Sequence, residues 1–344
     1  MPSQDLPQLQ WTIRNSSETY SISGVDRTVR SYDPQAALRD VSLFPVYRAQ
    51  ITNELFTQIV QDHYIVTNYG PPQDHYNEET RSRVLAPLFT HTVALFKLLV
   101  RNTPESIIEG RLPTKVRIEH LHAFGVVAIL FIQVKFMLKT GKEYLDTVAQ
   151  VIAEATACDY INSNRDLRTP IYAVLCDGTA FEFFMYTHHS NPRLSMGCFL
   201  FLASPTQFGQ QLKLADLRTE SVAAFLLSAR QICEALFHIS ILGYRNALQA
   251  YYDRFMKRAQ ESSETPDSTP QWSCSLGHVY VALDQTRRAA HWHADGQIDA
   301  AEAHAVLAAA TLEMSVQSAP EAYRRADAQA LDSHGWDSET IRNC

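Results

Sequence analysis

Residues 115–136, KVRIEHLHAFGVVAILFIQVKF, determine the fold that we expect. Their Val, Ile and Phe side chains are typical of β-strands, and the Phe-Gly pair in the middle can form the turn of a hairpin. Successive side chains of a strand point to opposite faces of a sheet, so Gln133 and Lys135 share a face. An acidic residue, Glu119, lies on the first predicted strand and faces this Gln-x-Lys sequence.

This arrangement has two interpretations. A carboxylate and an ammonium group beside a sheet edge can hold Mg²⁺, orient a water molecule and offset the charge of a scissile phosphate. Mg²⁺ needs only one or two protein carboxylates, because waters complete its coordination shell. Glu119 and Lys135 can equally form a plain cross-strand ion pair. The residues alone leave both interpretations open.

Further elements are predicted on both sides of this hairpin. Apolar residues at helical spacing predict one helix over 48–64 and a second from Asn77 to about Val100, which two prolines should kink or break. Asp177-Gly178 is a strong hairpin signal. In chain order, the other predictions are a helix over 143–161, strands over 171–176, 180–186 and 198–203, and, over 219–257, a long helix or two helices that meet near Gly243.

The composition divides the chain into four parts. Hairpins make antiparallel pairs and helices pack on sheets, so we expect an α+β protein with a central mixed sheet flanked by helices, in three layers, and with extra C-terminal helices. Along the chain, the four parts are a polar N-terminal arm over 1–45, an α/β domain over 46–258, a linker over 259–272 and an acidic helical extension over 273–344. We expect one short strand at 19–22 in the arm, and helices at 300–316 and 320–331 in the extension.

The overall composition is that of a large globular protein. The chain has 344 residues, of which 46% are hydrophobic, enough for a core without disulfide bonds. Its six cysteines are scattered and include no C-x-x-C pair, which favours a reducing compartment. The start of the chain lacks the basic and apolar regions of a signal peptide, and no apolar run is long enough for a membrane span. We therefore expect a nuclear or cytoplasmic protein that does not enter a membrane.

Charge is distributed unevenly along the chain. The chain has 30 basic and 37 acidic residues, a net charge of −7. Residues 97–142 contain 8 basic and 3 acidic residues, whereas residues 259–344 contain 5 basic and 13 acidic residues. A basic segment in a neutral body is compatible with a polyanionic partner such as nucleic acid, although solvated surfaces also show such imbalances.

Four features follow one another along residues 75–190. The first is Glu78-Glu79-Thr-Arg, followed closely by Pro-Leu-Phe. The second is the acidic residue of the central hairpin, and the third is its Gln-x-Lys sequence. The fourth is a helix with Gln150 and Glu154, followed by the Asp177-Gly178 hairpin. Together they resemble the PD-(D/E)XK nuclease superfamily, and in particular the nuclease-like domains common in fungal proteins.

This resemblance implies a restriction-endonuclease-like core and a nuclease that depends on Mg²⁺ or Mn²⁺. Glu119 and Gln133 would hold the metal, and Lys135 would position the attacking water or stabilise the phosphate. Glu79, or its neighbour Glu78, would bind a second metal or orient water. Basic residues would meet the phosphate backbone of DNA or RNA together with Gln150; they are Arg111, Lys115, Arg117, Lys139 and Lys142.

Two departures from the family pattern leave a second function open. Glu119 stands where the family has Asp. Gln133 stands where the family has Glu, which removes one negative charge from the implied metal site, and a neutral oxygen attracts Mg²⁺ less than a carboxylate does. The alternative to a nuclease is therefore a catalytically inactive nuclease-like protein that acts through a protein partner.

Several of these residues also have a structural interpretation. Glu78 and Glu79 can simply complement a helix dipole, Gln150 and Glu154 can form a solvated helix face, and Asp177-Gly178 is first of all a turn. The cysteine and histidines of the C-terminal part do not match zinc-finger spacing. The sequence contains no G-x-S-x-G, P-loop, H-E-x-x-H or G-x-G-x-x-G motif, so serine hydrolases, P-loop NTPases, zincins and dinucleotide-binding enzymes have no support.

Overall fold

The predicted central hairpin is present, as β3 (Lys115–Phe124) and β4 (Val127–Val134). Gly125 in its turn has a φ of +59°, the left-handed conformation that glycine adopts without a steric cost. Every residue of β4 is buried, so this strand lies inside the protein. The computed structural model describes residues 41–67, 77–96, 100–109, 115–135, 137–138, 142–188, 192–199, 211–262 and 269–319.

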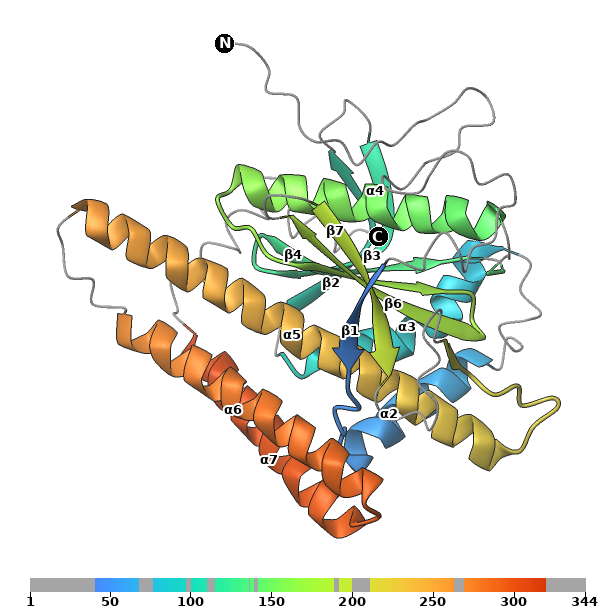
Figure 1. Cartoon of the computed structure of the whole chain (residues 1–344). Coiled ribbons are helices and arrows are strands. Elements are labelled where there is room, and N and C mark those ends of the chain that lie inside the picture. The colour runs from blue at the N-terminus through green and yellow to red at the C-terminus, as the bar shows by residue number, and fades with distance from the viewer. Residues whose placement is uncertain are drawn as a thin grey trace, which may run out of the picture.

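Among the described residues, an eight-stranded mixed sheet extends from this hairpin (Figure 1). The strand order is β1-β7-β6-β5-β4-β3-β2, and the short β8 pairs with β6. β1 runs parallel to β7 and β4 runs parallel to β5, while the other pairs are antiparallel. The remaining strands are β1 (Ser42–Val46), β2 (Val100–Glu109), β5 (Ile171–Cys176), β6 (Ala180–His188), β7 (Pro192–Phe199) and β8 (Leu212–Lys213).

Helices cover both faces of the sheet. α4 (Lys142–Asn164) packs on one face, and α3 (Glu78–Ala94) and α5 (Val222–Ser262) pack on the other (Figure 1). The remaining helices are α2 (Asn53–Thr67), α6 (Thr269–Ala294) and α7 (Ile298–Ser318). α6 and α7 pack together, and α6 contacts α5. The protein is therefore a mixed sheet between helical layers with additional C-terminal helices, which confirms the predicted fold class.

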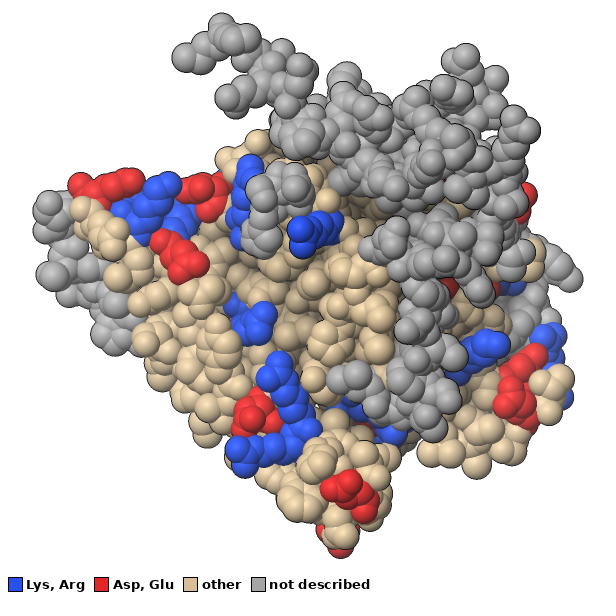
Figure 2. All heavy atoms as spheres, in the orientation of Figure 1, with Lys and Arg blue, Asp and Glu red and all other residues tan. Residues whose placement is uncertain are grey.

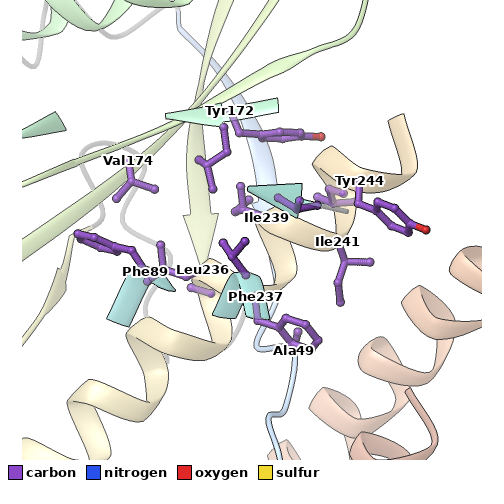
Figure 3. Packing of buried hydrophobic residues seen from close by; sticks show 14 of the residues in the cluster. Ala49, Phe89, Tyr172, Val174, Leu236, Phe237, Ile239, Ile241 and Tyr244 are labelled. Carbon is purple, nitrogen blue, oxygen red and sulfur yellow. The ribbon is translucent and has the colours of Figure 1, made fainter. Parts of the chain in front are cut away.

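The larger hydrophobic core lies between the sheet and α5. Tyr172 and Val174 of β5 lie on the side of the sheet that faces α5, in the same hydrophobic cluster as Leu236 and Phe237 (Figure 3). Their neighbour in the sequence, Leu175, belongs to the second core beneath α4. This alternation shows that β5 is buried on both faces, as expected for an inner strand between two helical layers.

α5 is one continuous helix rather than two helices that meet near Gly243. A Cβ atom at Gly243 would lie 3.1 Å from Ile129 Cβ, so glycine lets this helix approach β4 closely. Within the described residues, α5 is also the one helix long and apolar enough to cross a membrane, by length and composition. In the structure it packs on the sheet as the main core helix, with 56% of its most apolar segment buried inside the molecule.

The structure corrects several sequence predictions. The second helix ends at Ala94, and residues 100–109 form β2 instead of its continuation. The strand expected at 198–203 is β7, which ends at Phe199. Residues 259–262 and 269–272, expected in a linker, belong to α5 and α6, and α6 as a whole was not predicted. The short strand at 19–22 and the helix at 320–331 lie outside the described residues.

The turn of the central hairpin is held by residues from both helical layers. Asn162 of α4 donates to the Ala128 carbonyl at 2.8 Å and accepts from the Ala128 N–H at 2.9 Å. The hydroxyl of Tyr251, on α5, donates to the Phe124 carbonyl at 3.3 Å and accepts from the Val126 N–H at 3.2 Å. These bonds satisfy backbone groups next to the turn and so fix where β4 begins.

We expect Asn162→Ala to lower the free energy of unfolding by about 2 kcal/mol, because it leaves a buried donor and a buried acceptor of Ala128 without partners. Urea denaturation of the full chain measures this change. Asn164→Ala is the matched control, since Asn164 is exposed two residues later in the same helix. Equal stability of the two variants would contradict the prediction.

Candidate functional site

Three of the predicted site residues, Glu119, Gln133 and Lys135, meet at the end of β4, on the face of the sheet that α4 covers. β3 and β4 pair in the register His120–Ile132, which places Glu119 beside Gln133. Gln133 in turn pairs with Leu175 of β5, a residue of the core beneath α4. Residues paired directly across strands share a face, so Glu119 and Gln133 both point toward α4.

Glu119 is half-buried and bonds to the neighbouring strand. Its Oε2 accepts a hydrogen bond of 2.6 Å from the Val134 N–H. The carboxylate therefore lies against the backbone between Gln133 and Lys135. This position agrees with the prediction that Glu119 and the Gln-x-Lys sequence converge.

Gln133 connects Lys135 to a carboxylate of α4. Its side chain is buried, and one orientation of its amide satisfies both neighbours. In this orientation Nε2 donates to both carboxylate oxygens of Glu154 at 2.8 Å, and Oε1 accepts from Lys135 Nζ at 2.7 Å. The neutral amide of Gln133 thus lies between an acid and a base.

Glu154 is buried, so the expectation of a solvated helix face is wrong for this residue. Only 1% of it is exposed, and Gln150 Nε2 donates to its Oε1 at 2.9 Å. Burial is the main cause that raises the pKa of Glu154 from 4.5 to about 8; the charges of Glu119 and Glu78 also raise this pKa, whereas Gln150 and Lys135 lower it. A carboxyl that changes charge near neutral pH is typical of functional sites.

The structure distinguishes the two glutamates at the start of α3. Asn77 caps this helix by accepting from the Thr80 N–H at 2.7 Å. Glu78 is close enough to Glu154 to raise its pKa. Glu79 forms an exposed ion pair with Arg83 one helical turn later. Of the two glutamates that the sequence left open, Glu78 is therefore the one whose charge reaches Glu154.

We expect Glu78→Gln to lower the pKa of Glu154, because it removes a negative charge near that carboxyl. Glu79→Gln should leave this pKa unchanged, and the loss of its surface ion pair should cost less than about 1 kcal/mol of stability. NMR titration of the glutamate side-chain carboxyls measures both effects. Equal titration of Glu154 in the two variants would contradict the assignment of Glu78 to the site.

The structure describes only some of the predicted phosphate-binding residues. Arg111 and Lys139 lie outside the described residues, as do the side chains of Lys115 and Lys142. Arg117 is exposed on β3. Figure 2 shows Lys and Arg in separate groups on the face in view, some of them beside Asp and Glu, so the described residues form no continuous basic surface there.

Asp177 has a structural role. Its Oδ1 accepts from the Thr179 and Ala180 N–H groups, each at 2.9 Å, and its Oδ2 accepts from the Leu138 N–H at 2.9 Å. Its main-chain carbonyl accepts from Arg81 Nη1, which comes from α3, at 2.8 Å. The turn after β5 therefore holds both α3 and the segment that follows Lys135.

The histidines of β3 lie on the other face of the sheet. His120 bonds to Ser82 of α3 at 2.7 Å. Burial lowers the pKa of His122 to about 3, so this side chain is neutral in the core. Within the described residues, no group of three or more His, Cys, Asp or Glu side chains could hold a metal ion.

The donor chemistry of the site nevertheless suits Mg²⁺ or Mn²⁺. The charges of Glu78 and Glu119 both act on Glu154, and so does the charge of Lys135. Carboxylate and amide oxygens are the ligands that these metals prefer, and Mg²⁺ binds with one or two carboxylates when waters fill the other positions. The described residues do not form a cage made entirely of protein ligands, so water would have to fill most positions around such a cation.

Comparisons with known proteins add little to this description. No family model matches the chain, and no curated protein matches it. Among solved structures, the chain is similar to a cryo-EM structure of a DrdV–DNA complex, with 12% identity and a TM-score of 0.31. The match covers 81% of this chain and 28% of that chain, so it spans less than a third of the other protein.

Proposed function

We propose that the protein is a divergent nuclease-like enzyme that hydrolyses phosphodiester bonds of DNA or RNA with the help of Mg²⁺ or Mn²⁺. One observation carries this proposal. Side chains from α3, β3, β4 and α4 converge at one end of the sheet around the buried carboxyl of Glu154. Acidic side chains, an amide and a lysine from distant parts of the chain thus lie together, as the residues of a catalytic site do.

Each residue has a role that its position allows. Glu119 and the oxygen of Gln133 would hold the metal ion, which would supply Lewis acid activation and charge neutralisation. Lys135 would donate to a phosphate oxygen and offset the charge that develops there. Glu78 would orient the attacking water. Gln150, through its bond to Glu154, would keep the acid of α4 in place.

A nucleic acid substrate is supported by the basic segment 97–142, which carries 8 basic and 3 acidic residues. Contacts between Lys or Arg and phosphates release counterions, so affinity should fall steeply as salt increases. An affinity for DNA and RNA that does not change with salt would contradict a nucleic acid substrate. We further propose that the protein acts in the nucleus or the cytoplasm.

The proposal is tested by incubating the full chain with labelled single- and double-stranded DNA and RNA, in Mg²⁺, in Mn²⁺ and in EDTA. We expect cleavage that requires a divalent cation and that Glu119→Gln abolishes. Glu79→Gln is the matched control, since this exposed acid pairs with Arg83. Folded protein that cuts none of these substrates would overturn the proposal.

A second function, that of a catalytically inactive binding protein, is favoured by the contacts of Gln133. Its amide satisfies Glu154 and Lys135 at the same time, so the site is internally bonded without a cation. In that case Gln133→Glu should create cation-dependent cleavage that the wild-type protein lacks. Cleavage by the wild-type protein would exclude this second function.

A further inference from the structure

Two arginines lie along the line of contact between α5 and α6, which we call the α5–α6 seam. α6 packs on α5, on the side of the sheet opposite to α4 (Figure 1). Arg245 of α5 lies over the ring of Tyr280 of α6, with its Cζ 5.8 Å from the ring centroid. Arg287 of α6 lies over the ring of Tyr47 at 5.6 Å. In the described part of the chain, neither arginine has a carboxylate partner, and aromatic rings hold both guanidinium groups.

A buried histidine next to these arginines has an N–H group without an acceptor. The Tyr47 N–H donates to Nδ1 of His238 at 3.4 Å, and burial lowers the pKa of His238 to about 3. The ring is therefore neutral and carries its proton on Nε2. This nitrogen has no hydrogen-bond partner among the described residues. The charges of Arg287 and Arg245 also lower the pKa of His238, so the seam combines positive charge with an unused donor.

Acidic residues of the same two helices are bonded to other arginines. The buried Glu234 of α5 pairs with Arg48 and Arg230. Asp284 of α6 pairs with Arg288, whose Nε lies 2.8 Å from its Oδ2. Positive charges that share a partly buried region repel one another, and an anion between them removes this cost. The protein supplies such an anion to Arg48 and Arg230, whereas the described residues supply none to the two arginines of the seam.

We propose that a phosphate group binds at the α5–α6 seam, between the guanidinium groups of Arg245 and Arg287. Arginine presents its N–H groups in a planar fork that matches the oxygens of a phosphate. Arg245 contacts Tyr280 across the seam, and Arg287 follows Tyr280 by two helical turns, roughly 10 Å along α6. Two arginine side chains can therefore reach one phosphate from opposite ends.

This site is separate from the candidate nuclease site. α5 covers one face of the sheet, and α4 covers the other face together with the end of β4. Phosphate binding at the seam needs no divalent cation, because the positive charge comes from arginine. The inference therefore does not rest on the proposed nuclease function.

The experiment measures binding of inorganic phosphate and of adenosine monophosphate to the full chain by titration calorimetry, in EDTA and at constant ionic strength. EDTA removes divalent cations, so a metal site cannot contribute. We expect phosphate to bind the wild-type protein, and Arg287→Met to weaken this binding by about 10–100-fold because a charge-assisted hydrogen bond is lost. Arg245→Met should weaken it by a similar factor. Circular dichroism confirms that each variant is folded.

The matched control is Arg288→Met, the same change at the next position of α6, where the arginine pairs with Asp284. This variant should bind phosphate as the wild-type protein does. An equal loss in Arg287→Met and Arg288→Met would overturn the site, as would wild-type affinity in Arg287→Met.

The two ligands identify the source of the phosphate group. Tighter binding of adenosine monophosphate would show that the seam takes a nucleotide, and equal affinities would show that it recognises phosphate alone. Either result supports the site if Arg287→Met weakens the binding. A folded wild-type protein that binds neither ligand would overturn the inference, and cation-dependent cleavage that requires Glu119 would still support the proposed nuclease.

Discussion

Replacing Lys135 with alanine is expected to slow phosphodiester cleavage by about 10²–10³-fold, the usual cost of removing one group that stabilises charge in a transition state. Lys135 follows β4 directly and is half-buried, with its Nζ bonded to Gln133 at 2.7 Å. Its backbone N–H donates to the Cys176 carbonyl at 2.7 Å. The substitution keeps this backbone bond, so the strand end should retain its position while the positive charge disappears.

Steady-state cleavage of the best substrate measures this effect for Lys135→Ala and for a control. Lys213→Ala is the control, because Lys213 is an exposed lysine on β8 and its removal should leave the rate unchanged. Mn²⁺ binding should persist in Lys135→Ala, since no ligand oxygen is removed. A wild-type rate in Lys135→Ala would show that this lysine is only a partner in an ion pair or hydrogen bond.

Replacing Arg230 with methionine is expected to lower the free energy of unfolding by about 3–5 kcal/mol. The Arg230 Nε donates to Glu234 Oε1 at 3.0 Å, and its Nη atoms donate to the Ile51 carbonyl and to Asn53. Glu234 is fully buried. The variant therefore leaves a buried carboxylate with Arg48 as its remaining ion-pair partner and also removes a bond to the backbone ahead of α2.

This loss of stability should depend on pH. Burial raises the pKa of Glu234, and Arg48 and Arg230 oppose that increase. Without Arg230 the pKa in the folded state rises further, so the folded protein binds more protons than the unfolded chain at pH values above the ordinary glutamate pKa. Stability of the variant relative to wild type should then fall as pH increases from about 4.5 toward neutrality.

Urea denaturation at pH 4.5 and pH 7 tests both parts of this prediction. Arg288→Met is the matched control, because Arg288 forms an exposed pair with Asp284 one turn away in α6, and such pairs contribute less than about 1 kcal/mol. An equal deficit at both pH values would show that Arg230 acts through packing rather than through the charge of Glu234.

The two hairpins were predictable from sequence because their signals are local. Gly125 and Gly178 both have positive φ in the structure, and each lies between runs of β-prone residues. The start of α3 was also predictable, since Asn77 is a good helix cap and does cap it. The residue types at a turn and the spacing of apolar residues are enough to predict such elements, because both are local features of the sequence.

Other features depend on contacts that no local pattern contains. β2 contains Pro104 and continues directly from a helical pattern, and it forms a strand because β3 pairs with it along its length. Glu154 has the sequence pattern of a surface residue, but α4 places it over Gln133. Trp272 lies within a stretch that is polar in composition, and it is buried against Tyr251. In each case tertiary packing overrides the local preference.

The parallel pairing of β1 with β7 affects how the chain can fold during synthesis. Ser42 pairs with Ser195, so β1 emerges from the ribosome early but has no partner until β7 has been made. The ion pair between Arg48 and Glu234 forms later still. Until then the growing sheet presents the unpaired edge of β7, a surface prone to association with other chains. A shortened chain that begins after residue 50 would carry this open edge permanently and should aggregate.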